Sequence, residues 1–162
     1  MTIRPATEAD LQAILDIYND AVAKTVATFD TQPRTMADHR RWFAEHGRQH
    51  PILVAEEGGR VIGWASVSRY SGRCAYDGTA EASLYVEEAG RGRGVGRQLL
   101  GAIIAAGRQA GLHTIISRIA VGNDASVHLH EAFGFQTVGV MREVGFKFGR
   151  YVDVVVMQLI YR

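Results

Sequence analysis

Several features that would place a protein outside the cytoplasm are missing from this sequence. The 162 residues include one cysteine, Cys74, so no disulfide can form within the chain and a reducing compartment is favoured. No run of roughly 18 apolar residues, long enough to span a membrane, is present. The first residues, Met1 to Pro5, do not resemble the apolar region of a signal peptide. We therefore expect a cytoplasmic protein.

The sequence also lacks an excess of charge of either sign. Its formal net charge is +1, which gives no reason to expect a nucleic-acid or membrane partner. Hydrophobic residues make up 47% and charged residues 22% of the chain, the balance of an ordinary globular protein. The length fits one domain, so residues 1–162 are expected to form a single domain.

Hydrophobic spacing and turn residues predict a mixed α/β fold. Helical spacing follows a candidate N-cap at Thr7, Gly58-Gly59 marks a hairpin turn, and Gly111 is placed to end a helix. The expected helices cover residues 11–22, 36–48, 94–110 and 123–133, and the expected strands cover residues 2–6, 52–57, 61–68, 80–86, 114–121, 136–144 and 151–160, with loops at 69–79 and 145–150. This order indicates one mixed sheet with helices on both faces.

The sharpest local feature is a glycine-rich turn between an expected strand and an expected helix. It reads Arg91-Gly92-Arg93-Gly94-Val95-Gly96-Arg97-Gln98. Glycines let the backbone approach a ligand closely, and the free amides of a first helical turn, at the positive end of the helix dipole, bind phosphate. The three arginines add positive charge. The alternative is a surface turn with solvated arginines, and the pattern alone does not decide between the two.

Two other phosphate-binding motifs are incomplete here. A Walker A loop ends in Gly-Lys followed by Ser or Thr, whereas Gly96 is followed by Arg97. A dinucleotide fingerprint has its third glycine where this chain has Arg97, and an acidic residue about 20 positions later. No Asp or Glu occurs between Glu88 and Asp124. Both motifs are therefore disfavoured, and with the second one a nicotinamide-dependent oxidoreductase.

The pattern Arg91-x-x-Gly94-x-Gly96, after a strand that ends in Leu84-Tyr85-Val86, resembles the coenzyme-binding motif of the GNAT acetyltransferase superfamily. Five blocks in the right order also resemble phosphinothricin acetyltransferases and their methionine sulfoximine- and sulfone-acetylating relatives. These blocks are Phe29 to Pro33, Ala75 to Asp77, Glu81 to Val86, Asn123 to Ala132 and Gly145 to Gly149. The resemblance implies an α/β (α+β) GNAT fold, with a mixed twisted central sheet of about six to seven strands, two of them parallel and splayed, flanked by about four helices.

The resemblance further implies the cosubstrate and the site. Acetyl-CoA, without a metal, would lie between the splayed strands, and a small amine acceptor would attack it directly in a ternary complex. The residues expected to bind the coenzyme are Tyr85, Val86, Glu87, Arg91, Gly92, Arg93, Gly94, Val95, Gly96, Arg97, Gln98 and Asn123. The residues expected to bind the acceptor are Phe29, Arg73, Tyr76, Ala82, Ser83, Leu84 and Val154. The family's acid–base pair maps onto Glu81 and His130.

Each member of this pair has a structural alternative. A carboxylate at Glu81 could take the proton of the attacking amine, or it could bind a backbone amide or an arginine. His130 could serve as a second base or orient Glu81, or it could pack as a helix histidine near the sheet. His128 and His130 point to nearly opposite sides of a helix, so they do not form a metal pair. Cys74 is not expected to be a reactive thiol.

The acceptor is expected to be a small α-amino-acid analogue with a second acidic or tetrahedral polar group. Arg73 suits such a group because its guanidinium fork can bond two oxygens. The chain has Ser71 where phosphinothricin enzymes tend to carry a basic residue, which leaves the particular acceptor open. The alternatives are a protein N-terminus or lysine as acceptor, and a non-catalytic acetyl-CoA-binding sensor. By resemblance alone we expect a homodimer.

Overall fold

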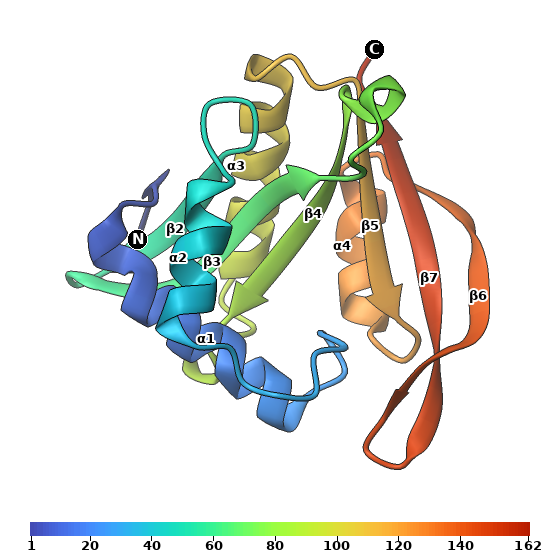
Figure 1. Cartoon of the computed structure of the whole chain (residues 1–162), viewed down its shortest axis with the longest axis horizontal. Coiled ribbons are helices and arrows are strands. Elements are labelled where there is room, and N and C mark those ends of the chain that lie inside the picture. The colour runs from blue at the N-terminus through green and yellow to red at the C-terminus, as the bar shows by residue number, and fades with distance from the viewer.

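The computed structural model describes residues 1–162 and is built on one seven-stranded sheet (Figure 1). The strand order is β1-β2-β3-β4-β5-β7-β6, and every neighbouring pair is antiparallel except β4 and β5. The strands are β1 (Thr2–Pro5), β2 (Ile52–Glu57), β3 (Arg60–Arg69), β4 (Thr79–Val86), β5 (Thr114–Ala120), β6 (Gln136–Lys147) and β7 (Arg150–Ile160).

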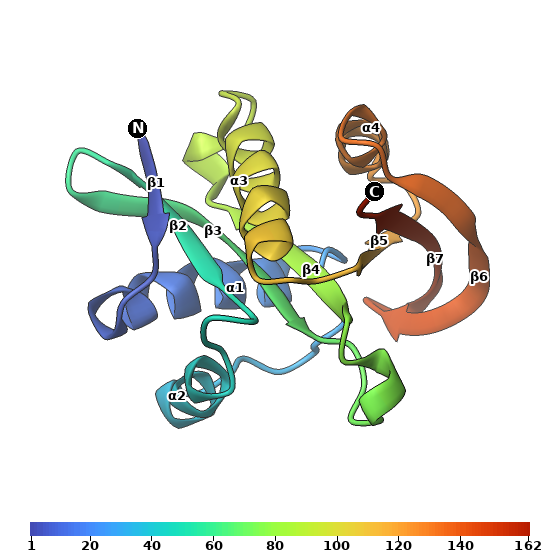
Figure 2. The same cartoon turned by 90° about the horizontal axis from the view of Figure 1, so that it is seen from above.

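Four α-helices cover the two faces of this sheet (Figure 2). They are α1 (Leu11–Lys24) and α2 (Met36–Ala44) on one face, and α3 (Val95–Gln109) and α4 (Asp124–Ala132) on the other. None of them is both long enough and apolar enough to cross a membrane. The predicted mixed α/β fold with a central sheet and four helices is confirmed.

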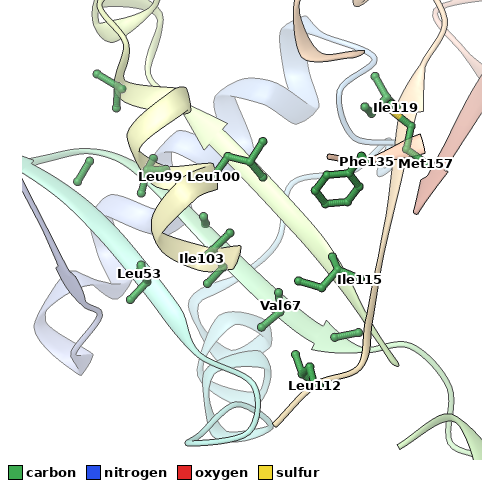
Figure 3. Packing of buried hydrophobic residues seen from close by; sticks show 14 of the residues in the cluster. Leu53, Val67, Leu99, Leu100, Ile103, Leu112, Ile115, Ile119, Phe135 and Met157 are labelled. Atoms are coloured by element: carbon green, nitrogen blue, oxygen red, sulfur yellow. The ribbon is translucent and has the colours of Figure 1, made fainter. Parts of the chain in front are cut away.

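The periodic apolar residues of the helices form a core on each face of the sheet. Leu99, Leu100 and Ile103 of α3 are fully buried in the larger core (Figure 3). On the other face, Ile14 of α1 packs in a smaller core with Trp64 of β3. Each such side chain contributes about 1.5–3 kcal/mol by leaving water, which fixes α3, and with it the glycine-rich turn, against the sheet.

The parallel strands β4 and β5 separate along their length. They pair only over Thr79–Glu81 and Thr114–Ile116 and then diverge (Figure 1). Beyond this point β4 stays paired with β3, and β5 stays paired with β7. The two facing edges therefore carry backbone N–H and C=O groups that have no strand partner. The predicted pair of splayed parallel strands is confirmed.

The second helix is shorter than the sequence predicts. A helix is predicted over residues 36–48, but α2 ends at Ala44. Gly47 and His50 exchange backbone hydrogen bonds, with N–O distances of 3.2 and 3.1 Å. The prediction was wrong because glycine has a low helix propensity and this local turn satisfies the backbone groups that a further helical turn would have used.

The last hairpin is more regular than the sequence predicts. A loop is predicted at residues 145–150, but β6 runs to Lys147 and β7 starts at Arg150. The connection is the dipeptide Phe148-Gly149, whose φ angles are 53° and 73°. Two consecutive residues with positive φ match the right-handed twist of the strands they join, so a two-residue turn replaces the predicted loop.

The irregular part of β6 lies before the turn. The register between β6 and β7 shifts between Met141 and Gly145. Within this stretch Glu143 has a φ of 51°, and its N–H donates to a carboxylate oxygen of Asp153 at 2.7 Å. A bulge of this kind bends a strand and redirects its side chains. Here Met141 and Val144 both reach the cavity described next.

Candidate active site

The divergence of β4 and β5 borders a cavity of about 540 Å³. Its walls come from β4, β5, β7, the β6 bulge, α4 and the segment between α1 and α2. The residues predicted for the site that line it are Phe29, Glu81, Ala82, Ser83, Leu84, Tyr85, Asn123, His130 and Val154. A cavity of this size and mixed polarity suits a small ligand.

Glu81 lies where the two parallel strands stop pairing. It is the last residue of β4 that pairs with β5, opposite Ile116. Its side chain is 27% exposed and forms an ion pair with Arg118 of β5, in which the guanidinium Nε donates to carboxylate Oε2. Glu81 is therefore bound to an arginine, which is the structural alternative considered for it above. The same residue also lines the cavity.

His130 reaches the same cavity from α4. It is 4% exposed, and its Nδ1 lies 2.7 Å from the Ser126 carbonyl oxygen. Because a carbonyl can only accept, Nδ1 carries the proton and Nε2 holds the lone pair. Burial lowers the pKa of His130, and the hydrogen bond to Ser126 opposes this shift only in part. The imidazole is thus neutral near pH 7, as a proton acceptor requires.

The glycine-rich turn opens the N-terminus of α3. Gly92 and Gly94 have φ angles of 73° and 80°, and no atom lies within 4 Å of where a side chain would begin. The first amide of the helix with a backbone acceptor is that of Gln98, which donates to Gly94. The amides of the residues between, starting at Val95, are free for a ligand. This arrangement is suited to bind phosphate.

The arginines of the turn are engaged on the protein surface. Arg93 binds both carboxylate oxygens of Glu57. Arg91 donates to the backbone carbonyl of Val86 at 3.3 Å. The guanidinium of Arg97 lies over the ring of Phe133, 5.3 Å from its centroid. The groups of the turn that are free for a ligand are therefore its backbone amides, whereas the arginine side chains already contact other parts of the protein.

The outer half of β4 and the start of α4 face each other across the opening. The ring centroids of Tyr85 and Trp64 lie 5.0 Å apart, and the Glu87 carboxylate pairs with Arg60. These contacts hold both side chains at the end of β4. The Asn123 side-chain oxygen accepts the Ser126 N–H and caps α4. Its amide nitrogen makes no hydrogen bond within the chain, so it is available to a ligand.

Phe29 closes the cavity on the acceptor side. Its ring lies directly on Gly145 of β6, where a β-carbon would come within 2.2 Å of a ring atom. Close by, the buried ammonium group of Lys147 donates to the Thr28 carbonyl at 2.9 Å. Burial lowers the pKa of Lys147. These contacts hold the segment between α1 and α2 against the last hairpin.

Arg73 and Tyr76 lie apart from the other predicted residues. They belong to an exposed loop before β4, and neither lines the cavity. The ring of Tyr76 packs edge-on against Tyr70, with centroids 5.3 Å apart. The Arg73 side chain is exposed on this loop, and its contact with the acceptor stays a prediction.

Several polar residues of the cavity are not among the predicted site residues, and three of them are Tyr18, Arg34 and Arg118. The Tyr18 hydroxyl bonds to Thr28 and Asp30, and burial, with help from Asp30, raises its pKa to about 12. Arg34 donates to Asp30 at 2.9 Å. Arg118 stands opposite, on β5. One signal was present in the sequence for Arg118, since it is the only charged residue of β5.

No group of three or more histidine, cysteine, aspartate or glutamate side chains comes close enough to hold a metal ion. The Nδ1 atom of His130 bonds to the Ser126 carbonyl, and its ring packs against that of Phe135 with the centroids 4.9 Å apart. The free thiol of Cys74 is exposed on the loop before β4.

The fold and the site fit a transferase that uses a phosphate-bearing cosubstrate: Glu81 and His130 line one cavity beside the splayed strands, and α3 starts with free amides at the glycine-rich turn. The family can be named as well. The chain belongs to the GNAT acetyltransferases: the family model described as Acetyltransferase (GNAT) domain matches residues 3–156. The protein is accordingly an acetyltransferase.

Individual relatives resemble the chain over nearly its whole length. A methionine sulfoximine/methionine sulfone acetyltransferase of Pseudomonas aeruginosa is 45% identical over 98% of this chain and 93% of its own. The crystal structure of a ribosomal-protein-alanine N-acetyltransferase from Brucella melitensis has a TM-score of 0.96, 40% identity, and coverage of 99% and 100%. A phosphinothricin acetyltransferase from Sinorhizobium meliloti, in complex with acetyl-CoA, has a TM-score of 0.94, 36% identity, and coverage of 98% and 87%.

Proposed function

We propose that the enzyme transfers the acetyl group of acetyl-CoA to the amino group of a small amino-acid-like acceptor, of the methionine sulfoximine, methionine sulfone and phosphinothricin type. One observation carries this proposal. Glu81 and His130, which are far apart in sequence, line one cavity of about 540 Å³ beside the splayed strands. The names of the relatives supply the acceptor type.

The donor is acetyl-CoA, and the residues present fit it. The amides from Arg93 to Arg97 would hold the pyrophosphate at the start of α3, where the Gln98 amide already donates to Gly94. The pantetheine arm, which carries amide groups that can replace a strand partner, would lie along the end of β4 at Tyr85 and Val86 and beside Glu87, the residue that follows the strand. The free side-chain amide of Asn123 would add a contact from the facing side.

The chemistry follows from the two proton acceptors. The amine nitrogen attacks the thioester carbonyl carbon, a C–N bond forms, the C–S bond breaks, and CoA leaves as a thiolate that takes up a proton. The acceptor arrives mainly as an ammonium ion, so it must lose one proton before attack and a second one afterwards. We assign the first proton to the Glu81 carboxylate and keep the neutral Nε2 of His130 as the second acceptor. General-base assistance of this kind contributes about 10²–10⁴-fold.

The second candidate function is acetylation of a protein N-terminus. The Brucella melitensis structure, whose name gives this activity, favours it. Against it stands the closed side of the cavity, where Phe29 packs on Gly145 and the Lys147–Thr28 hydrogen bond holds the covering segment. A polypeptide acceptor needs an open groove, so we place the small-molecule acceptor first.

Steady-state thiol release from acetyl-CoA tests this function. The acceptors are phosphinothricin, methionine sulfoximine, methionine sulfone and a peptide with N-terminal alanine. We expect saturable turnover of at least one small acceptor, and a kcat about 10²-fold lower or more in Glu81→Gln. Glu131→Gln, an exposed glutamate of α4, is the matched control and should keep full activity. Turnover of the peptide alone would replace the first function by the second.

The remaining proposals concern the whole chain. We propose that residues 1–162 act as one domain in the cytoplasm and that two copies form a homodimer. The exposed apolar side chains of the edge strand β6, among them Val138, Val140 and Phe146, support a second copy at that edge.

A further inference from the structure

The Glu81–Arg118 pair joins two opposite charges on the wall of the cavity, which both residues line. Arg118 projects from β5 at the first positions where that strand has left β4. Its side chain is 51% exposed, so it is reachable from solvent. The pair can therefore contact an acceptor that enters the cavity from solvent.

The ion pair leaves hydrogen-bonding capacity on both partners. A guanidinium has five N–H groups, and Glu81 accepts from only one, the Nε–H. The two terminal nitrogens of Arg118 make no other hydrogen bond in the chain, and together they can take a carboxylate through two parallel hydrogen bonds. On Glu81, Oε1 is also without a partner and can accept from an ammonium group.

The electrostatic surroundings keep Arg118 charged. The pKa of its guanidinium is raised, first by the hydrogen bond with Glu81 and further by the charge of Glu81 and by Tyr70. Tyr70 belongs to the loop that carries Arg73. Arg118 thus stands on the side of the cavity where an acid-binding arginine was expected, while Arg73 itself lies outside the cavity.

We propose that Arg118 binds the α-carboxylate of the acceptor while Glu81 binds its α-ammonium group, so that the pair selects free α-amino acids. The proposal rests on the acetyl-transfer function given above. An α-amino acid carries its two charges on one carbon atom, and a receptor for both must hold a cation and an anion in contact. Glu81 and Arg118 do so, and Glu81 then receives the proton from the nitrogen it has bound.

The same pair discriminates against other amines. An amine without a carboxylate would bring a positive charge close to Arg118 and supply no negative charge for the guanidinium to bind. In a peptide N-terminus the α-carboxylate has become a neutral amide, which cannot form two charged hydrogen bonds with the guanidinium. Arg118 therefore separates the two candidate functions, since it favours a free amino acid over a protein N-terminus.

The test compares methionine sulfone with its α-carboxamide in wild type, Arg118→Met, Arg118→Lys and Arg41→Met. Arg41 lies on α2, away from the cavity, and also pairs with a carboxylate, that of Asp38. We expect wild type to favour the acid over the amide in kcat/KM by about 10–100-fold. In Arg118→Met this ratio should fall to about 1 through a higher KM for the acid, with Arg118→Lys intermediate and Arg41→Met unchanged.

A loss of kcat that is equal for acid and amide in Arg118→Met, with the ratio unchanged, would overturn the proposal and leave Arg118 as a positioning residue for Glu81. Calorimetric binding of methionine sulfone to the enzyme loaded with CoA, which cannot transfer an acetyl group, gives a second readout, and Arg118→Met should weaken it by a similar factor. A wild type that acetylates acid and amide equally well retains the proposed function but removes the role of Arg118. A wild type that neither binds nor acetylates any of the small acceptors removes both.

Discussion

At the scale of single residues, the backbone conformation of Gly94 is expected to determine how well the turn binds the coenzyme. With a φ of 80° it occupies a region that alanine enters at a cost of about 1–2 kcal/mol. No neighbouring atom would clash with a β-carbon, so Gly94→Ala should fold and present the amides of the α3 N-terminus in a relaxed, less convergent arrangement. We predict an acetyl-CoA Kd raised by about 10-fold, measured by calorimetry.

Gly111 provides the matched control for this prediction. It lies at the other end of α3 with a φ of 84° and equally open space around it. Gly111→Ala should lose as much thermal stability as Gly94→Ala and keep the wild-type affinity for acetyl-CoA. Equal affinities in the two variants would show that the turn does not hold the pyrophosphate.

The residue scale also shows what the sequence could and could not predict at the site. Gly94 follows from a local pattern, because strand, glycines and helix are neighbours in the chain. Glu81 could be predicted as a site residue because it lies in the family-like block Glu81 to Val86. Its partner Arg118 lies 37 residues away on another strand. Only the parallel register of β4 and β5 brings the two side chains together. Arg73 shows the opposite case, since the motif names the residue while the loop conformation decides where the side chain points.

At the scale of elements, the bulged strand β6 supports the acceptor side of the cavity through Gly145. A β-carbon there would lie 2.2 Å from the Phe29 ring, so Gly145→Ala forces the ring and its loop away. We predict a loss of about 1–3 kcal/mol in unfolding free energy, measured by urea denaturation, together with a higher KM for the acceptor and an unchanged KM for acetyl-CoA.

Gly139 offers a control in the same strand. It lies before the bulge, and no atom stands within 4 Å of its would-be β-carbon. Gly139→Ala should leave the KM of the acceptor at the wild-type value. If Gly145→Ala also leaves that KM unchanged, Phe29 does not form a wall of the acceptor pocket.

The fold was largely predictable at this scale, and the exceptions have a common cause. Strand and helix periods, with the glycine and capping signals, gave the order of the elements and most of their limits. The early end of α2 and the bulge in β6 depend on contacts outside the local period: Gly47 pairs with His50, and Gly145 meets a phenylalanine more than a hundred residues earlier. Local hydrophobic spacing carries no information on such pairings.

At the scale of the whole molecule, buried and half-buried histidines couple stability to pH. Burial lowers the pKa of His39, His46, His50 and His130. Because their folded-state pKa values lie below the unfolded value of about 6.5, the unfolded chain binds more protons in acid. Their contribution to stability is therefore present above pH about 6.5 and is lost as the pH falls through that value and below. Urea midpoints should be lower at pH 5.5 than at pH 7.5.

His39→Phe isolates one of these groups. His39 is 2% exposed, both of its ring nitrogens lack a partner, and its ring stacks on Trp42. Phenylalanine can keep the stacking without burying polar atoms, so the variant should be at least as stable as wild type at pH 7.5 and should lose less stability at pH 5.5. An unchanged pH dependence would contradict this role of His39.

Assembly is the second prediction for the whole molecule. The exposed apolar side chains near the edge of the sheet are Val138, Val140, Val144 and Phe146 of β6 and Tyr151 of β7. A long edge strand with an apolar surface favours association with a second copy. Light scattering should give the mass of a dimer for wild type and of a monomer for Val140→Lys. A monomeric wild type at high protein concentration would refute the proposed homodimer.

The short parallel ladder has a consequence for the lifetime of the protein without its cosubstrate. Two half-sheets, β1 to β4 and β5 to β7, share a strand pairing of only three residue pairs, and this seam is where we expect the free enzyme to open first. Acetyl-CoA bound in the slot would bridge the seam, and at 100 times its Kd it would add about 2.7 kcal/mol of stability. Resistance to proteolysis would then follow the supply of acetyl-CoA, so a starved cell would degrade this enzyme sooner than a well-fed one.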